Sequence, residues 1–252
     1  MPQEGFLLRG TSGRYSNPTV STFVLVHSPL VGPFTWSLVA DDLGARGVSV
    51  ALPTLPEARR APYWRLHAEA VASQVAEAGS PLVLVAHSAA CPLLPAIGAA
   101  IAGTISAYVL VDGDLPLLLG AGGSRVDLLR EASPALADEL EALLAAGGSF
   151  PSWGDEDLRE EIPDQRLRAR VVAEVRPQPR QFWTEAMPAI PGWPDAPCGY
   201  LELSPHYAAA SARARDEGWR YRHLCGGHFE MLVRPADVAA AILDLAGENR
   251  SR

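Results

Sequence analysis

Short apolar runs alternate with longer amphipathic stretches through the first half of the chain. The runs are rich in valine and leucine and end in turn residues, as buried strands do; they cover 22–26, 48–52, 82–85 and 106–111. The stretches between them predict helices, over 34–46, 63–78 and 89–102. Strands that alternate with helices predict right-handed β–α–β units, and therefore a mostly parallel sheet with helices on both faces.

This regular alternation stops at Asp114. Beyond it no clear strand pattern is found up to residue 197, and helical stretches are expected at 125–146, 155–161 and 165–175. Strand-like runs return at 199–203 and 219–224, and the amphipathic run 236–245 predicts a final helix. We therefore expect a core made of residues 1–114 and 198–252, interrupted by a largely helical segment at 115–197.

A serine stands at the junction between the third strand-like run and the helix that follows it. The apolar run stops at Ser88, and the small residues Ala89 and Ala90 come next. A nucleophilic serine needs such a sharp strand-to-helix turn, because small neighbours let the backbone bend and leave the hydroxyl exposed. The usual motif is Gly-x-Ser-x-Gly, and here alanine occupies both glycine positions, at Ala86 and Ala90.

A second segment, near the C-terminus, carries a candidate base. His228 follows two glycines just before the last predicted helix. Serine is a poor nucleophile at neutral pH unless a base takes its proton, and histidine titrates in the right range. With the loop that starts at His27, these segments make the chain resemble the α/β-hydrolase superfamily over residues 21–245. It looks closest to an actinobacterial-type subgroup whose loop reads Val-His-Ser-Pro-Leu-Val-Gly-Pro.

The resemblance implies an α/β-hydrolase fold, with a mostly parallel central sheet flanked by helices. It also implies a helical cap inserted after the sixth strand, and the segment 115–197 would be this cap or lid. The antiparallel hairpin that often opens the fold is expected to be reduced or absent, since few residues precede Thr22. Ser88 would be the nucleophile and His228 the general base; His27 would brace the oxyanion loop and His87 would pack beside the turn.

The third member of the triad is displaced from its usual place. Most relatives carry an Asp or Glu after the penultimate strand, but here that loop, 203–207, has no carboxylate. The preceding parallel strand ends in Asp112, and some family members place their acid there. We choose Asp112 over Asp114 because it stands directly at the strand end. Glu202 and Glu230 are weaker candidates.

The oxyanion hole departs from the pattern as well. One backbone donor is expected from Ala89, and the other normally comes from the position that Pro29 occupies, but proline has no N–H group. Three alternatives stay open: Leu30 donates instead, the Ser28 hydroxyl substitutes, or the hole has one good donor.

Aromatic residues are the candidates for the substrate pocket. We expect Trp36, Trp153 and Trp183 to line it, while Phe182 and Trp193 either join them or fasten the cap to the core. The acidic stretch 155–161 is expected to be a solvated helix face and no metal site.

Composition narrows the function further. A net charge of −8 disfavours binding to nucleic acid. The three cysteines, Cys91, Cys198 and Cys225, have no paired spacing, which favours a reducing cytoplasm and no zinc cluster. No apolar run is long enough to span a membrane, and no cofactor motif is present. We expect a small-molecule substrate, with a homodimer left open.

We therefore predict a cofactor-independent serine hydrolase of a small or medium apolar ester, thioester or lactone. The alternative is a lyase, decarboxylase or cyclase on the same fold, in specialised metabolism, with Ser88 and His228 as acid–base groups. A ligand receptor that uses the same pocket without turnover is the third reading.

Overall fold

A parallel sheet forms the centre of the molecule. The computed structural model describes residues 21–57, 60–79, 81–118 and 122–248. In this part of the chain six strands pair in the order β2-β1-β3-β4-β5-β6, and every pairing is parallel. Their bounds are β1 Thr22–Val26, β2 Ser49–Ala51, β3 Leu82–His87, β4 Ile105–Val111, β5 Cys198–Glu202 and β6 Arg220–His223. The mostly parallel sheet is confirmed, and any opening hairpin would fall largely outside the described residues.

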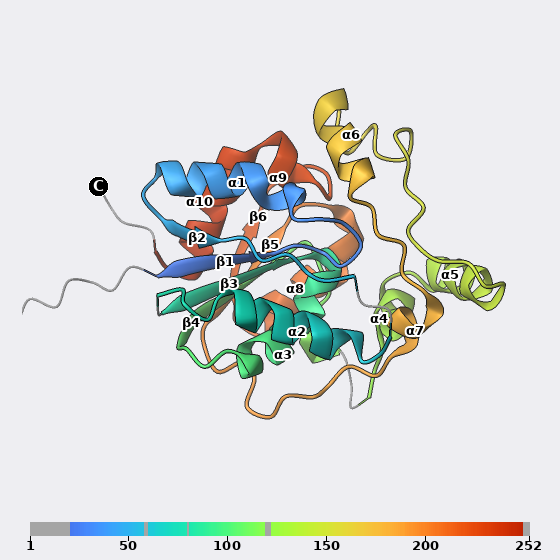
Figure 1. Cartoon of the computed structure of the whole chain (residues 1–252), viewed down its shortest axis with the longest axis horizontal. Helices are drawn as coiled ribbons and strands as arrows, with labels where there is room; N and C mark the ends of the chain where they lie inside the picture. The colour runs from blue at the N-terminus through green and yellow to red at the C-terminus, as the bar shows by residue number, and fades with distance from the viewer. Residues whose placement is uncertain (1–20, 58–59, 80, 119–121, 249–252) are drawn as a thin grey trace, which may run out of the picture.

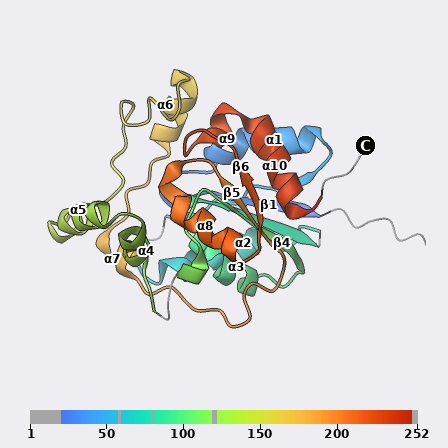
Figure 2. The same ribbon diagram turned by 180° about the vertical axis from the view of Figure 1, so that it is seen from behind.

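Helices cover both faces of this sheet, as the alternating pattern predicts (Figures 1 and 2). One face packs against α1 (Phe34–Ala45), α9 (Glu230–Val233) and α10 (Pro235–Ala246). The other packs against α2 (Tyr63–Gln74), α3 (Leu94–Ala100) and α8 (Ala208–Asp216). Because both faces are covered, the central strands are apolar throughout rather than alternating.

The segment between β4 and β5, called the insert below, holds four α-helices among its described residues, after a short 3₁₀ helix, Pro116–Leu118. They are α4 Arg125–Ala132, α5 Pro134–Ala145, α6 Gln165–Ala173 and α7 Arg180–Thr184. Figure 1 shows α4, α5 and α7 grouped beside the sheet, in yellow-green to orange, while α6, in gold, lies apart from them and contacts α1. Within the described chain the insert follows the fourth strand.

A buried ion pair joins two parts of the insert, and its carboxylate also fastens the insert to the core. Arg125, at the start of α4, donates to Glu185 with a separation of 2.8 Å, and both side chains are almost fully buried. The Glu185 carboxylate also accepts the backbone N–H groups of Tyr63 and Trp64 in the first turn of α2. An acidic group is favourable there because the first N–H groups of a helix have no partner within it.

Two helical predictions in the insert are wrong in detail. The predicted helix over 125–146 is broken at Ser133, because Pro134 begins a new helix there; proline suits the first position of a helix but not its interior. The stretch 155–161 forms turns instead of a helix.

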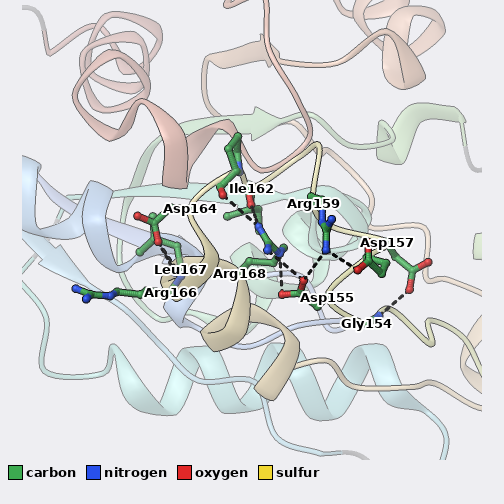
Figure 3. A network of polar contacts seen from close by, with 11 residues as sticks. Gly154, Asp155, Asp157, Arg159, Ile162, Asp164, Arg166, Leu167 and Arg168 are labelled. Carbon is green, nitrogen blue, oxygen red and sulfur yellow. Dashed lines mark hydrogen bonds and ion pairs between the residues drawn. The ribbon is translucent and has the colours of Figure 1, made fainter.

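The acidic residues of that stretch are tied down by neighbours, as Figure 3 shows. Asp155 accepts two hydrogen bonds from the guanidinium of Arg168 on α6, at 2.8 and 3.1 Å. Asp157 accepts from the backbone N–H of Gly154 at 2.7 Å. Asp164 caps α6 by accepting the N–H groups of Arg166 and Leu167. These contacts fold the segment into a compact turn.

No helix in the described part of the chain is both long and apolar enough to cross a membrane.

Candidate active site

Ser88 occupies a strained turn at the end of β3. Its φ angle is 57°, in the left-handed region that few residues other than glycine adopt. A short 3₁₀ helix, Ser88–Leu93, follows at once and leads into α3. The end of β4 presses against this turn at Gly113, where a Cβ atom would lie 2.5 Å from the carbonyl oxygen of Ser88. Only glycine allows this close approach.

Asp112 is the buried acid of the site. It stands directly after β4, with a φ of 43° and no exposed surface. Its Oδ1 accepts the N–H groups of Leu203 and Ser204, both at 2.9 Å, and its Oδ2 accepts the Ser204 hydroxyl at 2.7 Å. Burial alone raises the pKa of this carboxyl, but His228 and the Ser204 donors outweigh it and hold the pKa below its usual value. Asp112 is therefore ionised at neutral pH.

His228 bridges the acid and the serine. Its Nδ1 lies 2.7 Å from Asp112 Oδ2, and its Nε2 lies 3.0 Å from Ser88 Oγ. An ionised carboxylate can only accept, so Nδ1 carries the proton and Nε2 is free to accept from the serine hydroxyl. The structure thus brings together Ser88, His228 and Asp112, the three residues that the sequence singled out as a triad.

Two further rings lie against the His228 imidazole. Tyr207 stacks on it with ring centres 5.5 Å apart and planes inclined by 22°. His87 lies 4.4 Å away, and its Nε2 lies 3.0 Å from the His228 carbonyl oxygen. His87 ends β3 and Tyr207 follows β5, the strands on either side of β4, so the imidazole is approached from two sides. Burial, and then the charge of His228, hold the pKa of His87 well below its usual value.

The other carboxylates considered for the triad lie elsewhere. Glu230 accepts the N–H of Gly227 at 3.1 Å and pairs with Arg234, so it holds the histidine loop. Glu202 accepts the hydroxyl of Tyr221. Asp114 lies near the site but makes no contact with His228 Nδ1, which Asp112 occupies.

The loop after β1 is a tight turn braced by His27. The Leu55 N–H donates to Nε2 of His27 at 3.0 Å, so the proton lies on Nδ1, which donates to the Ser28 carbonyl at 2.8 Å. The Ser28 hydroxyl accepts the Leu30 N–H at 3.3 Å. The Pro29 carbonyl accepts from the Gln178 side chain at 2.9 Å.

Of the residues expected to form the oxyanion hole, some line the active-site cavity and others do not. Ala89 and Leu30 both line the cavity described below. Pro29 is not among the lining residues and has no N–H to offer, so its inclusion in the expected hole is corrected. Ser28 is buried and also lies outside the lining, which disfavours its hydroxyl as the substitute donor.

The burial of His27 predicts how the free energy of unfolding depends on pH. Burial, partly offset by the Ser28 carbonyl, lowers its pKa to about 4. An unfolded chain binds the proton near pH 6.5, so the stability from neutral His27 is present above that pH and is lost as pH falls toward 4. We expect this residue to cost about 2 kcal/mol of unfolding free energy between pH 7 and pH 5. Urea unfolding should show a shallower pH dependence in His27→Gln.

The matched control is His223→Gln, since His223 is exposed on β6. The free energy of unfolding of this variant should change with pH as it does in the wild type. Equal slopes for His27→Gln and the wild type would contradict the account of the loop.

A cavity of about 770 Å³ lies over Ser88 and His228, between the core and the insert. Its walls are mainly apolar and come largely from α4 and α5, including Leu128, Leu129 and Leu140. Trp153 and Trp183 line it, as expected. A cavity of this size and character suits a small organic ligand.

Trp36 does not line this cavity, and that prediction is wrong. Helix α1 turns its side chain toward the sheet, where it is fully buried and its Nε1 donates to the Val26 carbonyl at 3.1 Å. Phe182 and Trp193 are packing residues as well: Phe182 is fully buried against Tyr63, and Trp193 packs on Tyr108.

Sequence reasoning missed Tyr207 and Ser204. Both lie in the segment after β5, where the usual family pattern places only the acid of the triad. A tyrosine and a serine at the carboxyl end of a central parallel strand were the available signal, since ligands bind at that edge in α/β folds.

The model of the alpha/beta hydrolase family matches residues 23–241. The chain belongs to this family. No curated protein matches the sequence.

Solved structures share the fold at low sequence identity. An extracellular alpha/beta-hydrolase from a Paenibacillus species, with homology to tobacco salicylic acid binding protein 2, has a TM-score of 0.72 at 16% identity, over 89% of this chain and 98% of its own. Tomato methylketone synthase I has a TM-score of 0.66 at 15% identity, over 91% and 99%. A pyrethroid hydrolase from Sphingobium faniae has a TM-score of 0.61 at 18% identity, over 92% and 99%.

Proposed function

We propose that the protein is a cofactor-independent serine hydrolase of a small or medium apolar ester, thioester or lactone. The observation that carries the proposal is the continuous hydrogen-bond chain from Asp112 through His228 to Ser88, with distances of 2.7 and 3.0 Å. The strained backbone at Ser88 supports it, because such strain is maintained where function requires the side chain in one place.

The reaction would proceed through an acyl-enzyme. The Ser88 oxygen attacks the carbonyl carbon while its proton passes to His228 Nε2, and Asp112 stabilises the imidazolium. The tetrahedral intermediate collapses as the imidazolium protonates the departing alcohol or thiol. Water then attacks the ester on Ser88, His228 takes its proton, and the carboxylic acid leaves as the proton returns to Ser88.

The oxyanion would be held by two backbone donors, Ala89 N–H and Leu30 N–H. Ala89 lies in the first turn of a 3₁₀ helix, where N–H groups have no partner within the helix. The Leu30 N–H makes a long bond of 3.3 Å to the Ser28 hydroxyl, so a charged oxygen would compete well for it. Each donor contributes about 3 kcal/mol to the transition state.

The substrate class is inferred from the cavity. Its apolar wall, formed by the insert, favours an acyl or alcohol group of modest size, so we propose that the insert acts as a cap. The structural neighbours include a polyneuridine aldehyde esterase and a pyrethroid hydrolase, whose names are compatible with this class. The free cysteines, two buried and one exposed, suit the cytoplasmic location that we propose.

Pre-steady-state kinetics test the proposal. Mixing the protein with p-nitrophenyl butyrate should release a burst of about one p-nitrophenol per active site, followed by slower turnover, because an activated ester acylates Ser88 faster than water removes the acyl group. Absence of both burst and turnover across p-nitrophenyl esters and acyl thioesters would contradict the hydrolase assignment.

One feature favours a second candidate, a lyase, decarboxylase or cyclase. The Leu30 N–H is already engaged and Pro29 offers none, so the hole is poorer than usual for acyl transfer. Tomato methylketone synthase I, solved with 2-tridecanone, is a structural neighbour whose name describes another product class. In this case Ser88 and His228 would move protons and no covalent ester would form.

The ring of Tyr207 is expected to fix the orientation of the His228 imidazole by stacking on it. Its stacked ring stabilises the cationic form by about 1 kcal/mol. Tyr207→Leu should therefore lower kcat for an ester about fivefold to tenfold, with KM little changed. Tyr207→Phe keeps the ring and should stay within about threefold of the wild type; if both variants lose the same activity, the stacked ring is not the cause.

A further inference from the structure

Asp114, which the sequence offered as an alternative to Asp112, lines the cavity beside Ser88 and His228, and the proposed mechanism does not use it. It is half-buried and lies two residues after Asp112. Within the described part of the chain, its carboxyl has no hydrogen bond or ion pair with another residue. Most half-buried carboxylates are held by a donor, as Asp112 is.

Its position is at the junction of two cavities. Asp114 lines the main cavity together with Ser88 and His228, and it also lines a smaller cavity of about 350 Å³ beside α4 and α8. Tyr207 lines both cavities too, and after burial the negative charge of Asp114 contributes to raising the pKa of that tyrosine. The carboxyl is therefore close to the reacting groups and open to a ligand that occupies either cavity.

The charged groups around Asp114 do not neutralise the negative charge of its carboxylate. Burial, and then the negative charge of Glu131 on α4, raise the pKa of Asp114 to about 6, while His228 opposes the shift. Arg125, the cation that lines the same cavity, is paired with Glu185 instead. A carboxylate in this setting gains stability from any hydrogen-bond donor brought to it.

We propose that Asp114 is a specificity-determining residue, which accepts a hydrogen bond from a hydroxyl group that the substrate carries near its reacting carbonyl carbon. This inference rests on the proposed hydrolase function and narrows its substrate class to hydroxylated esters. The apolar wall of α4 and α5 would take the hydrocarbon part, while Asp114 fixes the orientation of the polar end beside Ser88.

Three esters separate this role from general activity. They are the p-nitrophenyl esters of butyric, 3-hydroxybutyric and 3-methoxybutyric acids; the last keeps the oxygen but has no proton to donate. The wild type should prefer the hydroxy ester over the methoxy ester by about tenfold or more in kcat/KM, the size expected for a hydrogen bond to a charged group. Asp114→Ala should reduce this ratio to about one.

Two further variants keep the test decisive. Asp114→Asn preserves the shape and a neutral acceptor, so its ratio should fall to between those of the wild type and Asp114→Ala. Glu131→Gln removes the neighbouring charge but keeps the acceptor, so the preference should remain. Circular dichroism and melting temperature show whether each variant folds, and if Asp114→Ala does not, Asp114→Asn carries the comparison.

The outcomes distinguish the two claims. If the wild type hydrolyses all three esters with equal kcat/KM, Asp114 does not select a hydroxyl group and the inference is overturned while the hydrolase function stands. A preference that persists in both Asp114 variants overturns it as well. If the wild type hydrolyses none of the esters, the proposed function fails and the inference fails with it.

Discussion

Replacing Ser88 with alanine is expected to lower kcat/KM for ester hydrolysis by about 10⁴-fold to 10⁶-fold. The substitution removes the nucleophile but little of the cavity wall. The two side chains that its hydroxyl contacts, His228 and Tyr207, keep their other partners. Binding of the substrate should survive, and the melting temperature should stay the same or rise, since strained functional residues often cost stability.

Ser211→Ala is the matched control for this variant. Ser211 is also a buried serine, but it lies on α8 and its hydroxyl donates to the Ala208 carbonyl. Its activity should match that of the wild type. Ester turnover by Ser88→Ala at the wild-type rate would show that another group performs the reaction.

Replacing Asp112 with asparagine is expected to lower kcat about 10³-fold to 10⁴-fold. All of the contacts to this carboxylate are donors, from Leu203, Ser204 and His228. An asparagine amide placed toward His228 would donate to Nδ1, so the proton would move to Nε2, where the base must accept from Ser88. The variant should also lose about 1 to 3 kcal/mol of unfolding free energy. The asparagine amide N–H₂ would then face the Ser204 hydroxyl, which donates to the same oxygen of Asp112 in the wild type.

Asp114→Asn is the comparison that identifies the acid. With an ester that carries no hydroxyl group, this variant should lose at most about tenfold in kcat, since Asp114 does not touch His228 Nδ1. If Asp114→Asn loses kcat about 10³-fold or more while Asp112→Asn loses at most about tenfold, the acid is Asp114 and the assignment of Asp112 is wrong.

The sheet and its helices could be predicted from the sequence because their signal is local. A run such as 82–87 is apolar at every position, which is what a strand covered on both faces requires. The positions of Ser88 and Asp112 followed from the same signal, since each stands where such a strand ends.

The remaining features depend on tertiary contacts. The break within 125–146 is the exception, because Pro134 is itself a local signal that a new helix begins there. Trp36 was expected at the cavity, but the face of α1 that carries it is fixed by packing against the sheet. The stacking of Tyr207 on His228 joins a loop after β5 to a loop after β6, a relation that no spacing along the chain reveals.

The most direct test of the central claim, an activated serine at position 88, is covalent labelling. The purified protein is treated with a fluorophosphonate and the modified peptide is located by mass spectrometry. The account predicts one adduct, on Ser88, which is lost in His228→Ala because the base that activates the hydroxyl is gone. Folded wild-type protein that gains no adduct, or gains it at another residue, would contradict the account.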